Sequence, residues 1–272
     1  MIPALLTDTV TLNLDRALYL TLLWGLEGVE LRTIGGPSDR VPFVNEEKLR
    51  RRLLENELPA VAIVPGMFEG PVRDRRTWMN EVAAFDEVLS FCRRIDCPCV
   101  VVSAFAAEDE GTPIEEAARA LRMAGDKAAD YGVRMAVLNE PGSAFPTGRA
   151  LATLLETANH PAVGGAWNPG AALQAGENPS EGLQALAGRV FLVRCSDWRL
   201  DPDRGVWEPA PFGEGAVGWP AQLRLLRDMD FTGPLSLEVR AEPRAKRGLH
   251  DATRLLQLLR QVRKPSSATT ER

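Results

Sequence analysis

Hydrophobic positions along the chain follow two spacings: short apolar runs, and longer stretches with apolar residues three or four positions apart. The short runs predict eight β-strands, at residues 3–8, 28–32, 59–66, 98–105, 133–140, 162–168, 190–197 and 234–239. The longer stretches, such as residues 77–95 and 113–132, predict an amphipathic helix after each strand. Strands that alternate with helices in this way are expected to be parallel.

Eight strand–helix units predict a closed (β/α)8 barrel, the TIM barrel, and 272 residues is a normal length for one. The competing fold is an open doubly wound sheet, which usually has a glycine-rich phosphate loop after its first strand. The segment TDTVTLN at residues 7–13 contains no glycine. No repeat or linker is evident, so we expect one domain over residues 1–263, including a C-terminal helix, and a disordered polar tail at residues 264–272.

Composition narrows the function classes. The net charge of −5 does not offer the basic face that nucleic-acid binding requires. No signal peptide is evident, and the apolar stretches are too short to span a bilayer. The only histidines, His160 and His250, exclude a site built from several imidazoles. We expect a cytoplasmic protein with a small-molecule partner, neither nucleic acid nor membrane, and with a homodimer as an open option.

Polar residues stand at the predicted C-terminal ends of strands five to eight, where TIM barrels carry their catalytic groups. These residues are Glu140, Asn168, Arg194, Ser196, Asp197, Glu238 and Arg240. Side chains alternate along a strand, so an inward Glu140 implies that Leu138 and Ala136 also point inward. The same rule places small or apolar residues below Asn168, Arg194 and Glu238. A filled barrel with a polar mouth requires this pattern.

On these elements the sequence resembles the xylose isomerase-like TIM barrels. That superfamily holds sugar isomerases and epimerases, hydroxypyruvate isomerase, inosose dehydratase and endonuclease IV. The resemblance extends roughly from GVELR at residue 28 to LSLEV at residue 239. It is carried by GVEL on strand two, VLNEPG at the end of strand five, and FGEGAVGWPAQLRLLRDMDFTGPLSLEV at residues 212–239.

In the isomerase and epimerase members, the resemblance implies one divalent cation held by Glu, Asp, His and Glu from strands five to eight. The two glutamates also exchange the substrate proton, and they match Glu140 and Glu238, our expected catalytic pair. The aspartate position falls on Asn168 and the histidine position on Arg194. Asp197 matches an aspartate that follows the histidine in the family.

These substitutions predict an altered metal site. Mg²⁺ and Mn²⁺ favour charged oxygen ligands, so Glu140, Asn168 and Glu238 would form at most a weak site. Arg194 keeps its proton and would repel a divalent ion. We therefore expect no cofactor, with a weak Mg²⁺ or Mn²⁺ site as the alternative. Our interpretation is that Arg194 replaces the metal electrostatically between the two carboxylates.

The resulting hypothesis is a sugar or sugar-acid isomerase or epimerase. Glu140 and Glu238 would be its acid and base, and its substrate-binding residues would be Arg194, Asn168, Asp197 and Arg240. The alternative is a catalytically inactive barrel that binds a metabolite, since the fold alone does not decide activity. An endonuclease IV-like repair enzyme ranks last, because its chemistry needs a histidine-rich zinc cluster.

Several of these residues also have structural interpretations. We expect a local ion pair between Glu30 and Arg32 on strand two. Asn168 could equally cap the loop after strand six, and Asp197 could equally pair with an arginine. The segment GEGAVG at residues 213–218 favours a flexible loop over a phosphate site. Four aromatic residues after strand seven could stack on a sugar or serve as packing: Trp198, Trp207, Phe212 and Trp219.

Overall fold

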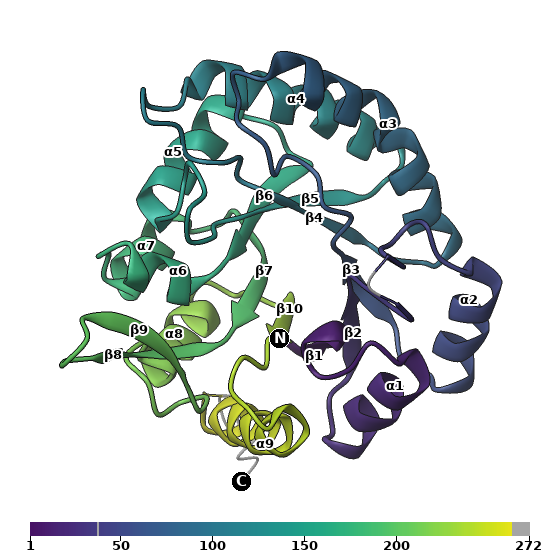
Figure 1. The fold of residues 1–272 in the computed structure, drawn as a ribbon, viewed down its shortest axis with the longest axis vertical. Helices are drawn as coiled ribbons and strands as arrows, with labels where there is room; N and C mark the ends of the chain where they lie inside the picture. Colours follow the sequence, from purple (N-terminus) through teal and green to yellow (C-terminus); the bar gives the residue numbers. More distant parts are fainter. Residues whose placement is uncertain (37, 263–272) are drawn as a thin grey trace, which may run out of the picture.

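The computed structural model describes residues 1–36 and 38–262 and contains a closed barrel of eight parallel strands (Figure 1). In order around the barrel, neighbouring strands are β1, β10, β7, β6, β5, β4, β3 and β2. Their bounds are β1 Ile2–Leu6, β2 Gly28–Leu31, β3 Ala60–Ile63, β4 Cys99–Ser103, β5 Arg134–Leu138, β6 Val163–Trp167, β7 Val190–Cys195 and β10 Pro234–Leu237. The predicted barrel and its eight strands are confirmed. The tail predicted for residues 264–272 lies outside the described residues.

The helices form a ring around the barrel (Figure 1). Their bounds are α1 Leu14–Leu23, α2 Glu46–Glu55, α3 Arg75–Arg94, α4 Ile114–Asp130, α5 Gly148–Ala158, α6 Pro169–Gln174, α7 Pro179–Ala185, α8 Trp219–Asp228 and α9 Arg244–Val262. Side-chain caps explain where several begin. Asn13, Asn45 and Thr147 each accept a hydrogen bond from a backbone amide of the first turn of α1, α2 and α5. None of the described helices is long and apolar enough to cross a membrane.

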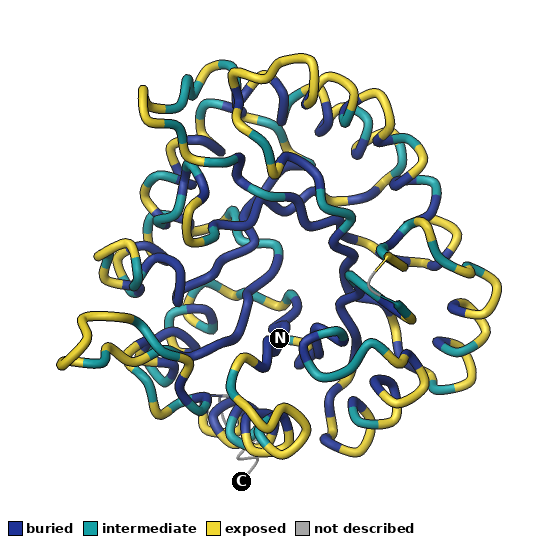
Figure 2. The backbone as a smooth tube through the Cα atoms, in the orientation of Figure 1, coloured by how far each residue is buried: buried dark blue, intermediate teal, exposed yellow. Residues whose placement is uncertain are grey.

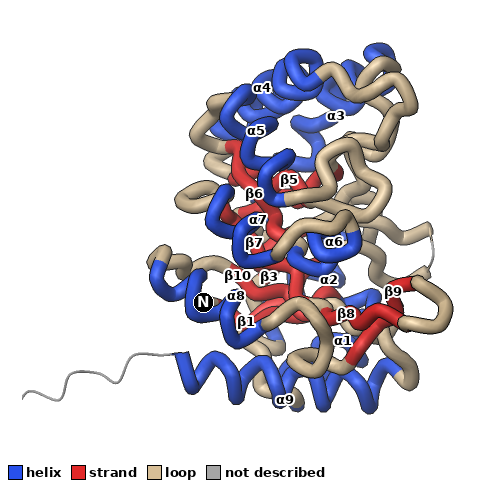
Figure 3. Tube along the Cα trace, turned by 90° about the vertical axis from the view of Figure 1, so that its left-hand side faces the viewer, coloured by secondary structure: helices blue, strands red, loops and turns tan. Residues whose placement is uncertain are grey.

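The structure adds elements that periodicity does not predict. A 3-10 turn, Thr7–Thr9, follows β1, and the short helix α6 follows β6. The run predicted as one strand over residues 190–197 is divided. β7 ends at Cys195, and the chain leaves the barrel as an antiparallel hairpin of β8 Asp197–Asp201 and β9 Val206–Ala210. The hairpin projects from the end of the barrel opposite the N-terminus (Figure 3).

The core has two layers, one between strands and helices and one inside the barrel. The strands are buried, while the helices expose their outer faces (Figure 2). Small and apolar side chains fill the barrel: Leu6, Ala62, Val64, Cys99, Val101, Ala136, Leu138, Ala166 and Leu192. The inward direction predicted for Ala136, Leu138, Ala166 and Leu192 is therefore confirmed, whereas Val190 packs on the outer layer, beside a register shift between β6 and β7. Because the interior is apolar, charged groups at its upper end must find partners among themselves.

Candidate active site at the barrel mouth

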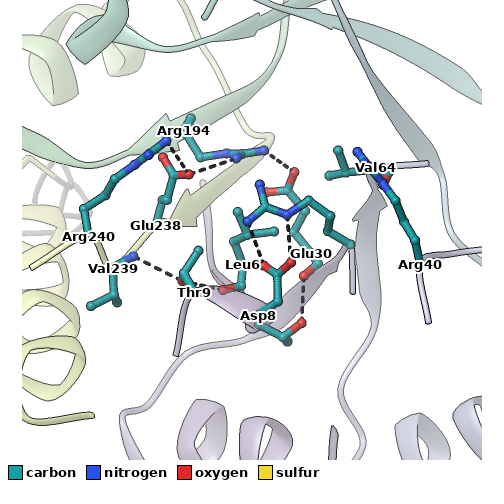
Figure 4. A network of polar contacts seen from close by, with 12 residues as sticks. Leu6, Asp8, Thr9, Glu30, Arg40, Val64, Arg194, Glu238, Val239 and Arg240 are labelled. Carbon is teal, nitrogen blue, oxygen red and sulfur yellow. Dashed lines mark hydrogen bonds and ion pairs between the residues drawn. The ribbon is translucent and has the colours of Figure 1, made fainter. Parts of the chain in front are cut away.

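Arg194 lies inside the barrel mouth at the upper end of β7, with only 2% of its side chain exposed. Its Nη2 atom donates to Glu30 Oε1 at 2.5 Å, and its Nη1 atom lies 3.6 Å from Glu238 Oε1. The guanidinium therefore stands between two carboxylates (Figure 4). Burial disfavours the charge of Arg194, but Glu30, Glu238 and Glu140 together outweigh it and raise the pKa of the guanidinium. Arg194 remains a cation at any physiological pH.

Glu30 is a member of this cluster that the sequence did not place there. Its side chain is fully buried and also accepts a hydrogen bond from the Ser236 hydroxyl. The predicted local ion pair between Glu30 and Arg32 is wrong, because Arg32 binds Asp8 instead, through two hydrogen bonds of 2.7 and 3.1 Å. Glu30 points into the barrel within β2, whereas Arg32 follows the end of that strand. A lone carboxylate in the apolar segment GVEL was the available signal for this partner.

Glu238 follows β10 and belongs to the closed part of the mouth, with 3% of its side chain exposed. Its Oε1 atom accepts a hydrogen bond from Arg240 at 2.8 Å and faces Arg194. Its Oε2 atom is buried and has no hydrogen-bond partner among the described residues, nor does the Nε atom of Arg194. The cluster thus holds one unpartnered carboxylate oxygen.

Glu140, after β5, has a different environment. Its carboxyl forms no hydrogen bond or ion pair with any described residue, although its backbone amide donates to Ser143. The pKa of Glu140 is raised, because the effect of burial exceeds the opposing effect of the nearby Arg194 cation. Glu140 and Arg194 both line a cavity of about 270 Å³, whose wall also includes Arg32 and Arg40. Glu238 is absent from that wall.

Three larger hollows lie elsewhere on the described part of the molecule. One of about 430 Å³ borders Arg134 and Phe191 at the N-terminal ends of the strands, one of about 870 Å³ runs beside α2, and one of about 510 Å³ borders Asn13 and Phe43. None of the three contains Glu140, Arg194 or Glu238. The cavity of about 270 Å³ is therefore the one that the charged strand-end residues Glu140 and Arg194 line.

Asn168 and Asp197 use their side-chain oxygens within the protein. Asn168 accepts a hydrogen bond from the Ala171 amide and caps α6, as its alternative interpretation expects. The Asp197 carboxylate accepts from backbone amides of Trp198 and of the loop at residues 213–217. Burial raises the pKa of Asp197, and these four amides oppose that rise. The alternative in which Asp197 pairs with an arginine is wrong, because backbone donors surround it.

The same contacts clarify the residues after β7. The amides of Gly213, Gly215 and Val217 already bind Asp197, which leaves that loop fewer donors for a phosphate. Trp219 is fully buried and packs on Phe212, with ring centroids 4.6 Å apart, so this pair serves as packing. Arg240 lies over the Trp198 ring at 5.6 Å and donates to Glu238.

The donor set does not fit the divalent metal that the resemblance implies. A guanidinium stands at the histidine position, within 4 Å of two carboxylates. The Asn168 amide oxygen is committed to its helix cap. In the described part of the chain, no group of three or more His, Cys, Asp or Glu side chains could hold a metal ion. A second cation would have to displace Arg194, so the residues present do not fit this metal.

The fold and the strand-end charges define an eight-stranded barrel with a cluster of charged residues at its C-terminal mouth. The xylose isomerase-like TIM barrel family matches residues 19–261, and the chain belongs to that family. None of the curated sequences compared with the chain matches it.

Solved structures agree on the fold. The IOLI protein with a bound zinc atom has a TM-score of 0.80 and 18% identity, over 97% of this chain and 100% of that one. An L-ribulose 3-epimerase has a TM-score of 0.78 and 14% identity, over 100% and 99%. A xylose isomerase-like TIM barrel protein from Mycobacterium smegmatis, in complex with magnesium, has a TM-score of 0.70 and 16% identity, over 91% and 88%. At these identities the similarity shows the fold.

Proposed function

We propose that the chain is a sugar or sugar-acid isomerase or epimerase in which Arg194 takes the electrostatic role of a metal ion. One observation carries the proposal: the buried Arg194 guanidinium and the unpartnered Glu140 carboxyl line the same cavity. Membership of a family whose similar structures include an L-ribulose 3-epimerase supports it.

The reaction requires removal of a proton from the carbon beside a carbonyl group, followed by its return to the same or the neighbouring carbon. Glu140 is the proposed base, and its raised pKa makes the carboxylate a stronger proton acceptor. The Arg194 guanidinium stabilises the negative charge that develops on the substrate oxygen. Glu238, with its unpartnered Oε2 atom, is the proposed second carboxyl. Contacts of substrate with Arg240, Asn168 and Asp197 remain predictions.

Solvent exchange tests the proposal. A panel of ketoses, aldoses and sugar acids is incubated with the protein in deuterated water, and deuterium at the carbon beside the carbonyl is measured by NMR. We expect exchange on at least one compound, and the Glu140→Gln substitution should slow it by about 10²- to 10⁴-fold. The matched control Glu156→Gln lies on α5 and pairs with Arg189 at the surface, so it should leave the rate unchanged. Absence of exchange on every compound, with and without Mn²⁺, would contradict the proposal.

A non-catalytic metabolite-binding barrel is the second candidate, and the closed state of the Arg194 cluster favours it. Arg194, Glu30 and Glu238 are almost fully buried and already paired. Such a barrel would be stabilised by a ligand in thermal unfolding without exchanging any proton, and Glu140→Gln would leave that stabilisation intact. An endonuclease IV-like activity stays last: His160 pairs with Asp126 on α4, and His250 lies on α9.

A further inference from the structure

Two arginines from the segment after β2 line the same cavity as Glu140, and the proposed chemistry leaves them unassigned. The first is Arg32. Its Nε and Nη2 atoms bind the two oxygens of Asp8, which fixes the plane of the guanidinium. Its Nη1 atom forms no hydrogen bond with a described residue. Asp8 therefore fixes the Nε and Nη2 edge of the guanidinium, and the Nη1 atom can still donate to a ligand.

The second is Arg40, which is positioned in the same manner. Its Nη2 atom donates to Glu69 at 2.9 Å. Its Nε atom donates to the carbonyl of Val64, which lies beside it, at 3.3 Å (Figure 4). The guanidinium lies against the backbone of Gly66, where an added Cβ would stand 2.4 Å from Arg40 Cζ. Gly66 has a φ of +80°, so the turn and the close approach both need glycine. The Nη1 atom of Arg40 again has no hydrogen bond to a described residue.

The charges around the cavity indicate what these free donors would bind. Three guanidinium groups and two carboxyl groups line it: Arg32, Arg40, Arg194, Glu69 and Glu140. Outside the wall, Asp8 pairs with Arg32, and Glu30 and Glu238 lie beside Arg194, so these carboxylates offset much of the positive charge. A ligand with a single negative charge is therefore accommodated at a lower electrostatic cost than a phosphate dianion.

We infer that Arg32 and Arg40 bind the carboxylate of the substrate, which makes the substrate a sugar acid. The inference rests on the proposed function and narrows its substrate class. Guanidinium forks match the two oxygens of a carboxylate, and charge-assisted hydrogen bonds favour it over a neutral hydroxyl. A carboxylate held there leaves the adjoining carbons in the cavity that Glu140 and Arg194 share. Arg32 and Arg40 are thus specificity-determining residues.

Calorimetric titration tests this without relying on turnover. The probes are a set of hexonates and hexuronates, the neutral ketoses, and fructose 6-phosphate. We expect the wild-type protein to bind an acid more tightly than any neutral ketose. Arg40→Gln should lower the affinity for that acid by about tenfold or more. The affinity of Arg40→Lys should lie between those of the wild type and Arg40→Gln, since lysine keeps the positive charge but loses the forked pair of donors. Arg40 is partly exposed, so both variants should fold.

Arg73→Gln is the matched control. Arg73 also binds one glutamate, Glu108, and one backbone carbonyl, that of Gly111, but it is outside the cavity wall. It should leave the affinity for the acid unchanged. The inference is overturned if no acid in the set binds, if a neutral ketose binds more tightly, or if Arg40→Gln has no effect. If fructose 6-phosphate is the only probe that binds, the two arginines bind phosphate, and the inference of a carboxylate site is overturned.

The outcomes also separate this inference from the proposed function. If an acid binds in a manner that depends on Arg40 but no compound exchanges a proton, the carboxylate site is supported and the proposed isomerase or epimerase function is contradicted. If neutral ketoses exchange a proton at equal rates in the wild type and Arg40→Gln, the proposed isomerase or epimerase function is supported and the carboxylate site is contradicted.

Discussion

The two sides of the barrel mouth hold their carboxyl groups in opposite ways. On the side of β2, β7 and β10, Glu30 and Glu238 are buried against Arg194, with 0% and 3% of their side chains exposed. On the side of β5, Glu140 borders a cavity and pairs with none of the described residues. The first side is a fixed array of charges, whereas the second has a carboxyl that is free to change its protonation.

The difference between the two sides suits the proton transfer that we propose. A buried ion pair rarely stabilises a fold more than apolar residues of the same volume would, because desolvation offsets the attraction. What the closed side offers is a preorganised positive charge, held beside the cavity without reorganisation during a reaction. The open side offers a titratable base. A proton-transfer site needs both, and the mouth separates them.

Removal of Arg194 should have the largest effect on stability. Arg194→Met leaves Glu30 and Glu238 buried without their cation. Breaking a buried pair in this way costs about 3–5 kcal/mol, and we expect that loss in the free energy of unfolding measured with urea.

A triple variant provides the control for this prediction. Adding Glu30→Gln and Glu238→Gln to Arg194→Met removes the stranded charges and should recover most of the loss. A loss below about 1 kcal/mol for Arg194→Met alone would mean that the closed side is not an ion-paired array.

A smaller effect is expected at Gly66, on the open side. Gly66→Ala requires alanine at a φ of +80°, which costs about 1–2 kcal/mol in the left-handed region. The added methyl group would also displace the flexible end of Arg40. Gly188→Ala is the matched control, since its φ is +78° and no atom lies within 4 Å of its added Cβ. The two variants should lose a similar free energy of unfolding in urea, and only Gly66→Ala should bind the sugar acid more weakly. Equal acid affinity in the two variants would contradict the role of the Gly66 turn.

Most of the fold could be predicted from the sequence, because each barrel strand and each long helix has its own hydrophobic period. The exceptions depend on local chemistry. The helix α6 begins where Asn168 caps it and Pro169 takes its first position, a pattern that also indicates a turn. The hairpin after Cys195 forms beside Asp197, whose carboxylate collects amides from the following loop. Such contacts join residues up to twenty positions apart and leave no period in the sequence.

The positions of the site residues could be predicted from the sequence better than the contacts between their side chains. Strand ends identified Glu140, Arg194 and Glu238 as mouth residues, since each lies in the C-terminal part of a predicted strand. The contact of Arg194 with Glu30 spans 164 residues and joins β7 to β2, which are not neighbours in the barrel. Alternation tells which residues point inward, but it does not tell which long side chains meet across the interior. Glu30 was therefore assigned to the wrong partner.

The smallest effect separates the two proposed catalytic glutamates by its sign. Because burial raises the pKa of Glu140 in the folded state, the folded protein binds that proton more tightly than the unfolded chain does. The carboxyl therefore favours folding below its unfolded pKa, about 4.3, and this contribution is lost as the pH rises through the folded pKa. Glu140→Gln removes the titration, so its free energy of unfolding relative to wild type should rise across that window and then remain constant.

Glu238→Gln provides the contrast at pH 7. Glu238 contacts both Arg194 and Arg240, so its neutralisation should destabilise the protein, whereas Glu140→Gln should not. Denaturation curves of both variants and the wild type at several pH values measure the two signs. If Glu140→Gln destabilises the protein at pH 7 as strongly as Glu238→Gln does, then Glu140 has a buried partner of its own. The open side would in that case be a second closed array, and the mouth would have no free base.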